Sequence, residues 1–222
     1  MIRRLQVTAW LMIMGYTVFG QSPAGLSVGF DVMKVIPVFF NSGYMLEPSL
    51  IYTSRSNIII DLAAGFTNVK KDTVYNNATY FNKGYYLRLD AGGMVLKDPG
   101  RFKQYYIMAG LVYSDFTERV NARFYDGYHY YSDAFTTLEQ SNRLVSLEIQ
   151  PGYRLPLMNS RFSVNFQGRF SWVITEYSQE KFPVYLVPGV GYVATGKDNV
   201  DSSDISAGAS IRIVYKLLAI NN

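Results

Sequence analysis

Residues 161–173 read RFSVNFQGRFSWV, and large apolar side chains alternate with polar ones along this stretch. The apolar positions are Phe162, Val164, Phe166, Phe170 and Trp172. The polar positions between them are Ser163, Asn165, Gln167, Arg169 and Ser171. Successive side chains of a β-strand point to opposite faces, so the stretch predicts a strand with one apolar and one polar face.

The same two-faced pattern recurs in seven other segments. Their approximate ranges are 26–33, 44–52, 58–67, 84–95, 106–114, 143–154 and 205–215. Eight strands, an even number, can close into an antiparallel barrel. Closure also leaves no unpaired strand edge in lipid, where such an edge is unfavourable. We therefore predict an all-β fold, namely an eight-stranded antiparallel transmembrane β-barrel.

The connections between these segments fall into two classes. Those after the second, fourth and sixth segments are short, whereas those after the third, fifth and seventh are long, at about 69–83, 116–142 and 174–203. Short periplasmic turns and long outer loops are typical of outer-membrane barrels. The last loop contains FPVYLVPGVGYV at 182–193, which is too apolar to lie free in water. We expect it to fold over the barrel mouth as a lid or to dock on a neighbouring protein.

Alternation alone does not say which face points outward, because a soluble ligand-binding barrel has the same period with its apolar side chains inside. The polar face favours a membrane barrel, since it carries many glycines and isolated charges rather than the Lys, Glu and Thr of a water-exposed surface. Small residues leave room for a few long ones in the narrow interior of an eight-stranded barrel. The charged side chains expected in the lumen are Asp31, Glu47, Asp61, Arg88, Asp90, Glu148, Arg169 and Arg212.

These charges predict a lumen that is closed by ion pairs, since an unpaired charge in a confined site is unfavourable. The alternative is a narrow pore, gated or ion-selective, that the same charges line. Pro48 interrupts the second segment, where its missing N–H is unfavourable in lipid unless the strand bulges there.

The N-terminus has the order of a secretory signal peptide, with Arg3 and Arg4 followed by an apolar run over 10–19. We expect cleavage after residues 1–20, which leaves a barrel domain over 21–222 in the cell outer membrane. The apolar run is too short for a membrane-spanning helix. The chain has no cysteine, and without its first 20 residues the net charge falls from +4 to +2, which is too small to indicate nucleic-acid binding.

The single histidine, His129, lies in the longest loop near Ser132, Asp126 and Asp133. A base, a nucleophile and an orienting carboxylate are the groups that acyl transfer needs, so an enzyme that transfers or removes acyl chains of lipid A is an alternative function. The spacing matches no catalytic motif, however, and a surface loop accommodates a histidine without any such role. We therefore expect no enzyme, and one histidine without cysteine also predicts no metal site and no cofactor.

The same loop is rich in aromatic residues, which dominate contacts with sugars and with protein partners. The binding candidates are Phe124, Tyr125, Tyr128, His129, Tyr130, Tyr131 and Phe135. The alternative is that these rings pack on one another and continue an aromatic girdle at the membrane surface. We expect a monomeric barrel in outer-membrane lipid and lipopolysaccharide, with a structural role or with an envelope protein or a glycan as its partner.

Residues 83–90 read KGYYLRLD, a lysine–glycine pair followed by aromatic residues and an arginine. In this stretch, and more loosely across most of 21–222, the chain resembles a family of small eight-stranded outer-membrane proteins of Bacteroidota-type Gram-negative bacteria, for which no function is established. Asp90 stands where that pattern has a glycine. The architecture also resembles the OmpA and OmpX barrels. The resemblance implies the same membrane barrel and no particular activity.

Overall fold

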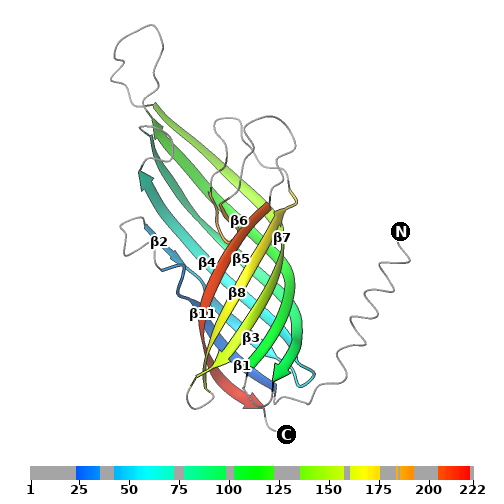
Figure 1. The fold of residues 1–222 in the computed structure, drawn as a ribbon. Helices are drawn as coiled ribbons and strands as arrows, with labels where there is room; N and C mark the ends of the chain where they lie inside the picture. Colours follow the sequence, from blue (N-terminus) through cyan, green and yellow to red (C-terminus); the bar gives the residue numbers. More distant parts are fainter. Residues whose placement is uncertain are drawn as a thin grey trace, which may run out of the picture.

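The computed structural model describes residues 24–35, 43–72, 78–98, 103–122, 136–157, 161–175, 184, 186–192 and 205–220, which are mostly β-strand (Figure 1). The strands are β1 (Ala24–Asp31), β2 (Gly43–Leu46), β3 (Pro48–Thr53), β4 (Ile58–Asp72), β5 (Ala78–Asp98), β6 (Lys103–Ala122), β7 (Thr136–Pro156), β8 (Phe162–Val173), β9 (Leu186–Val187), β10 (Gly191–Tyr192) and β11 (Ile205–Ile220). The signal peptide expected over 1–20 lies outside these residues and stays a prediction. Within the described residues, no helix is long and apolar enough to span a membrane.

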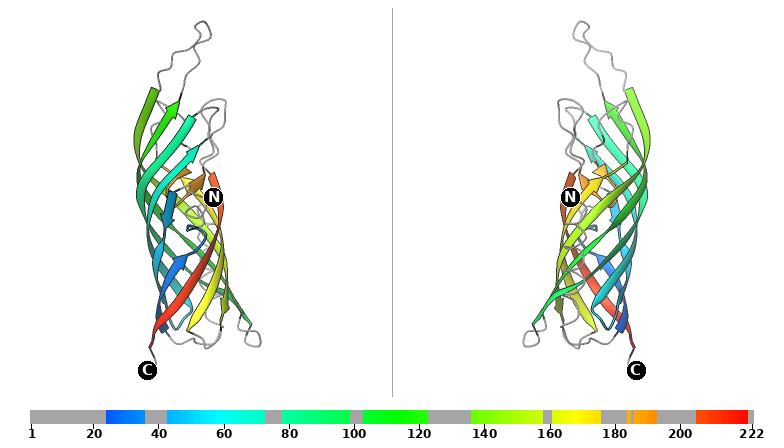
Figure 2. Two further views of the ribbon diagram at one scale, coloured as in Figure 1. Left: turned by 90° about the vertical axis from the view of Figure 1, so that its left-hand side faces the viewer. Right: turned by 90° about the vertical axis from the view of Figure 1, so that its right-hand side faces the viewer.

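Nine of the strands form one antiparallel sheet that closes on itself. β2 and β3 both pair with β4 and together occupy one position in the barrel, while the pairing of β4 with β5 closes the circle. The barrel therefore has eight strand positions, and Figure 2 shows its wall from two further sides. The prediction of a closed, eight-stranded antiparallel barrel is confirmed.

The register of the strands determines how the barrel is staggered. A row of paired residues that starts at Ile205 in β11 runs once around the barrel and returns to β11 at Tyr215, ten residues further along the chain. Between these two it passes through Trp172, Leu147, Leu111, Leu89, Leu62, Leu50 and Val28. Such a stagger tilts the strands against the barrel axis. The row joins only apolar and aromatic residues, so the two-residue period of all eight strands is in phase on the outer surface.

The outer surface of the barrel is apolar. Leu89, Phe170 and Trp172 are among its large side chains, and each exposes more than half of its surface. The charged residues next to them on the same strands, Arg88, Asp90 and Arg169, point inward and are buried. A soluble barrel has the opposite arrangement, whereas an apolar exterior around a polar interior is the arrangement of a transmembrane barrel. The transmembrane prediction is therefore confirmed, and the soluble alternative is excluded.

Aromatic rings lie near both ends of the apolar surface, as is typical of the two membrane interfaces. At the end where β3 turns into β4, ring contacts join Tyr105 to Tyr153, Tyr153 to Phe166, and Phe162 to Tyr215, with centroid distances of 5.1, 6.3 and 4.8 Å. Toward the other end, the rings of Tyr85 and Tyr113 are 6.5 Å apart. We call the first set the lower girdle and the second pair the upper girdle.

Strands β5, β6 and β7 are longer than the sequence predicts. They have 21, 20 and 21 residues, about twice the 9–11 that cross a membrane. Their outer ends lie above those of β8 and β11 (Figure 1), and β5 and β6 continue beyond Tyr85 and Tyr113 of the upper girdle. Much of 69–83 and 116–142, which we expected to be loop, is therefore strand. The sequence pattern did not reveal these extensions because the outward face changes from apolar to polar above the girdle. There Lys83 and Arg119 face outward, while Phe116 is buried inside. Polar outer residues made these parts of the strands resemble loops.

Pro48 separates β2 from β3 without a bulge. Leu46 pairs with Phe66 and Ser49 with Ala63, so two residues lie opposite two across the break and the register is unchanged. The carbonyl of the preceding residue accepts a 3.2 Å hydrogen bond from the Asp31 N–H of β1. Since backbone groups alternate between the two neighbouring strands, the donor that proline lacks is on the β4 side. The strand thus has no bulge at Pro48, and the proline interrupts the ladder instead.

Candidate functional site

The interior of the barrel is built in layers, and β5 passes through all of them. From its outer end to its lower end, the buried side chains of β5 include Tyr80, Tyr86, Arg88, Asp90 and Met94. Met94 belongs to an apolar cluster with Ile51, Ile59, Tyr106, Met108 and Val214. Tyr86 belongs to a second apolar cluster with Val112, Phe116, Leu144, Val173, Val184, Val187 and Val190. The charged layer around Arg88 and Asp90 therefore lies between two apolar layers.

The structure places all eight charged residues of the predicted set in this layer, none of them more than 3% exposed. Glu47 lies at its centre. Its Oε1 accepts hydrogen bonds from Arg88 Nη1 at 2.6 Å, Arg169 Nη2 at 2.7 Å and Arg212 Nη2 at 2.5 Å. Its Oε2 accepts from the Tyr86 hydroxyl. One carboxylate thus joins three arginines that come from β5, β8 and β11.

Each of these arginines also has a second carboxylate. Arg88 Nε lies 2.8 Å from Glu148 Oε1, and Arg169 Nη2 lies 3.2 Å from Asp31 Oδ2. Arg212 Nη1 forms an ion pair with Asp61. The remaining acid, Asp90, accepts a 2.8 Å hydrogen bond from Gln150 Nε2 and lies 3.9 Å from Arg88 Nε. All eight charges are therefore in one connected network, which is what makes burial of so many charges tolerable.

Neutral side chains complete the network, and sequence reasoning did not single them out. Ser171 donates to Glu148 at 2.8 Å, and Ser210 donates to Asp31 at 2.7 Å. Gln150 bridges Asp90 and Glu148. Their position on the polar faces of the strands was the only signal in the sequence, because all of their partners except Glu148 beside Gln150 are at least 23 residues away along the chain.

Part of the last long loop, namely residues 184 and 186–192, lies inside the lumen above the charged layer; we call it the plug. Buried, inward-facing side chains of the wall donate to its backbone carbonyls: Asn82 to Leu186 at 2.7 Å, Ser114 to Pro188 at 2.6 Å, Arg88 to Gly189, and Ser206 to Val190 at 3.3 Å. The plug includes the short β9–β10 hairpin, drawn in orange in Figure 2. The expectation of a lid at the barrel mouth is thus refined, because the segment fills the lumen.

The turn of the plug fits only a glycine at position 189. The φ angle of Gly189 is +80°, and a Cβ there would lie 2.5 Å from the ring of Tyr86. A positive φ and a close approach are both reasons for glycine. Since Tyr86 also donates to Glu47, the plug and the charged layer share two residues, Tyr86 and Arg88.

The wall that rises above the upper girdle has its own buried polar group. The hydroxyl of Tyr80 donates to Glu118, which also accepts from Gln140 Nε2 at 3.2 Å. Burial, and then the neighbouring Glu118 carboxylate, raise the pKa of Tyr80 above its ordinary value, so the phenol keeps its proton and remains a donor. This group holds β5, β6 and β7 together where they leave the membrane.

The aromatic binding candidates and His129, Ser132, Asp126 and Asp133 lie in 123–135, outside the described residues. Their roles in binding or in acyl transfer therefore stay predictions. Among the residues that the structure describes, no group of three or more His, Cys, Asp or Glu side chains could hold a metal ion.

No protein-family model and no curated protein matches the chain. Solved structures do resemble it. A major outer membrane protein from Thermus thermophilus is 12% identical, with a TM-score of 0.52 over 87% of this chain and 99% of that one. The N-terminal β-barrel domain of Pseudomonas aeruginosa OprF is 12% identical, with a TM-score of 0.46 over 90% and 100%, and Neisserial surface protein A is 12% identical, with a TM-score of 0.44 over 90% and 100%.

At this identity the Thermus structure is informative about the fold alone. Its match covers nearly the whole of both chains, so the closed eight-stranded barrel described above resembles the fold of an outer membrane protein. The protein therefore has the fold of an outer-membrane β-barrel.

Proposed function

We propose that this protein is an integral outer-membrane β-barrel that does not conduct solutes and that acts at its outer end, in a structural role or by binding an envelope protein or a glycan. It performs no catalysis in this proposal. The observation that carries it is the filled lumen, in which the plug, the charged layer centred on Glu47 and the lower apolar layer follow one another along the axis.

The geometry of the charges supports closure rather than conduction. In an ion-conducting pore, charged side chains line a wet path and remain available to the passing ion. Here Arg88, Arg169 and Arg212 are each engaged by at least two carboxylates, and none is more than 3% exposed. Solutes would also have to pass the apolar layers above and below.

The outer end of the barrel supports a binding role. Strands β4 to β7 continue beyond the upper girdle, and their outward-facing side chains change there from apolar to polar. A barrel needs no such extension to cross a membrane. The aromatic-rich residues 123–135 follow directly on β6 in the sequence, and the last residue of that strand, Ala122, lies beyond the upper girdle.

Planar-bilayer recording of the refolded protein tests the closed lumen. We expect no steady unitary currents, because buried ion pairs and the plug occupy the lumen. A known porin inserted in the same bilayer is the positive control. Reproducible conductance steps from the wild-type protein would contradict the proposal and would favour the narrow pore.

A further inference from the structure

Outward-facing cations gather on the β4–β7 wall just above the upper girdle. They are Lys70, Lys83, Arg119 and Arg143, which we call the outer basic surface. Among the residues whose side chains the structure describes, Asp115 and Glu139 are the acidic ones on the same part of the wall. Cations therefore outnumber acids among the described side chains on this part of the wall.

The strand register brings the cations to one place. Lys70 of β4 and Arg119 of β6 lie on either side of Phe81 in β5, since Phe81 pairs with both of them. The guanidinium of Arg119 lies 4.6 Å from the centroid of the Phe81 ring, a cation–π contact that holds it in position. Lys83 is two residues along β5 from Phe81 and points to the same side of the sheet.

Hydroxyl groups and a further arginine border these cations. Thr117 pairs with Lys83 across the β5–β6 ladder, and its hydroxyl is 2.9 Å from that of Ser141. Arg143 uses Nε for its 2.9 Å contact with Asp115, and its side chain remains 77% exposed. Ammonium, guanidinium and hydroxyl groups together are the donors that bind phosphate esters.

The height of the cations above the upper girdle indicates which kind of lipid headgroup can reach them. Lys83 is two residues above Tyr85, and Arg119 is six residues above Tyr113, which at about 3.3 Å per residue places them roughly 7 and 20 Å further along their strands. With a strand tilt of about 45°, these become roughly 5 and 14 Å above the girdle. A phospholipid headgroup, about 5–7 Å deep, reaches Lys83 but not Arg119. A headgroup of several phosphorylated sugars reaches both.

We propose that the outer basic surface is a binding site for a phosphorylated glycolipid of the outer leaflet, with acyl chains on the apolar wall below and phosphates held by Lys83, Arg119 and their neighbours. This names the ligand class for the outer-end binding role proposed above and rests on it. Arg143 and Tyr85, which share Asp115, mark the lower border of the site.

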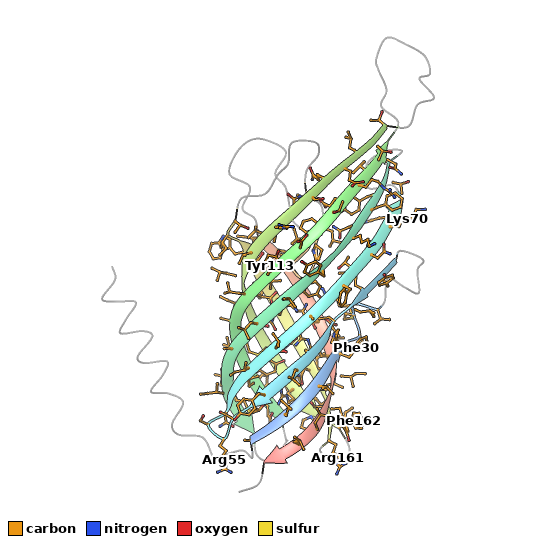
Figure 3. The ribbon with its side chains drawn as sticks, turned by 180° about the vertical axis from the view of Figure 1, so that it is seen from behind. Phe30, Arg55, Lys70, Tyr113, Arg161 and Phe162 are labelled. Atoms are coloured by element: carbon orange, nitrogen blue, oxygen red, sulfur yellow. The ribbon has the colours of Figure 1, made fainter. Side chains whose placement is uncertain are left out.

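The test is a lipid titration of the whole purified barrel in detergent, with bound lipid counted by native mass spectrometry. The probes are a lipopolysaccharide with a phosphorylated inner core, the same glycolipid after dephosphorylation, and phosphatidylglycerol. The variant is K83Q/R119Q. The control is R55Q/R161Q, which removes the same charge from exposed positions at the opposite end of the barrel, where Figure 3 shows both arginines, far from Lys70.

We expect the wild type to bind the phosphorylated glycolipid most tightly. A cation near a membrane surface strengthens binding about fivefold, so K83Q/R119Q should weaken it more than tenfold, whereas R55Q/R161Q should stay within twofold. Equal binding by the double variant, an equal loss in the control, or equal binding of the dephosphorylated glycolipid or phosphatidylglycerol would overturn the inference. Lys83 and Arg119 lie outside the lumen, so the result of this titration does not depend on whether the barrel conducts. Conductance of the wild type would contradict the closed lumen and is a separate result.

Discussion

Replacing Glu47 by glutamine removes the carboxylate at the centre of the charged layer and keeps its volume. A loss of stability in this variant therefore reports on charge and not on a cavity. The substitution leaves Arg88, Arg169 and Arg212 buried, and it directs an amide with its own N–H donors at them. Breaking one buried ion pair typically destabilises a protein by about 3–5 kcal/mol.

The ion pairs that remain in this variant place the expected loss of stability in the lower part of that range. Each arginine keeps its second carboxylate, namely Glu148, Asp31 or Asp61. We therefore expect Glu47→Gln to lower the free energy of unfolding by about 3 kcal/mol, roughly a hundredfold in the folding equilibrium. The assay is urea unfolding in lipid vesicles, with the folded fraction read from the mobility of unheated samples on a gel.

Asp115→Asn is the matched control. It also removes one carboxylate that pairs with an arginine, but the partner Arg143 is 77% exposed on the outer surface. Exposed pairs contribute little and are screened by salt, so we expect no measurable change. Equal stabilities of Glu47→Gln and Asp115→Asn would refute the view that the buried network holds the barrel together.

Two further substitutions probe the plug and the strand break. Gly189→Ala adds a Cβ against Tyr86 at a positive φ, so we expect the free energy of unfolding to fall by at least about 1–2 kcal/mol and the plug to be proteolysed faster. In the control Gly168→Ala, the nearest atom to the new Cβ would be 3.6 Å away, so stability and proteolysis should not change. Equal behaviour of the two variants would exclude a tightly seated plug. Pro48→Ala restores the missing N–H opposite β4, so we expect unchanged or slightly higher stability. Hydrogen exchange should then show a slowly exchanging amide at position 48. Rapid exchange there would show that the strand stays divided without its proline.

The sequence by itself determined the membrane-spanning part of the barrel. Side-chain direction in a strand depends only on the two-residue period, so the alternation in 161–173 assigned Arg169 to the interior and Trp172 to the exterior without any knowledge of neighbouring strands. The same period identified the other strands and the charges that the structure places in the lumen. Where lipid gives way to water, the outer face becomes polar, and the pattern no longer separated strand from loop.

Only the tertiary structure decided which charges meet. Glu47 contacts Arg88, Arg169 and Arg212, which are between 41 and 165 residues away along the chain. These contacts depend on the stagger of the closed barrel, and that stagger is the combined result of every strand pairing. The plug was decided in the same way. Its sequence showed that 182–193 avoids water, but only the closed lumen, with Asn82, Ser114 and Arg88 aimed inward, gives its carbonyls a place to bind.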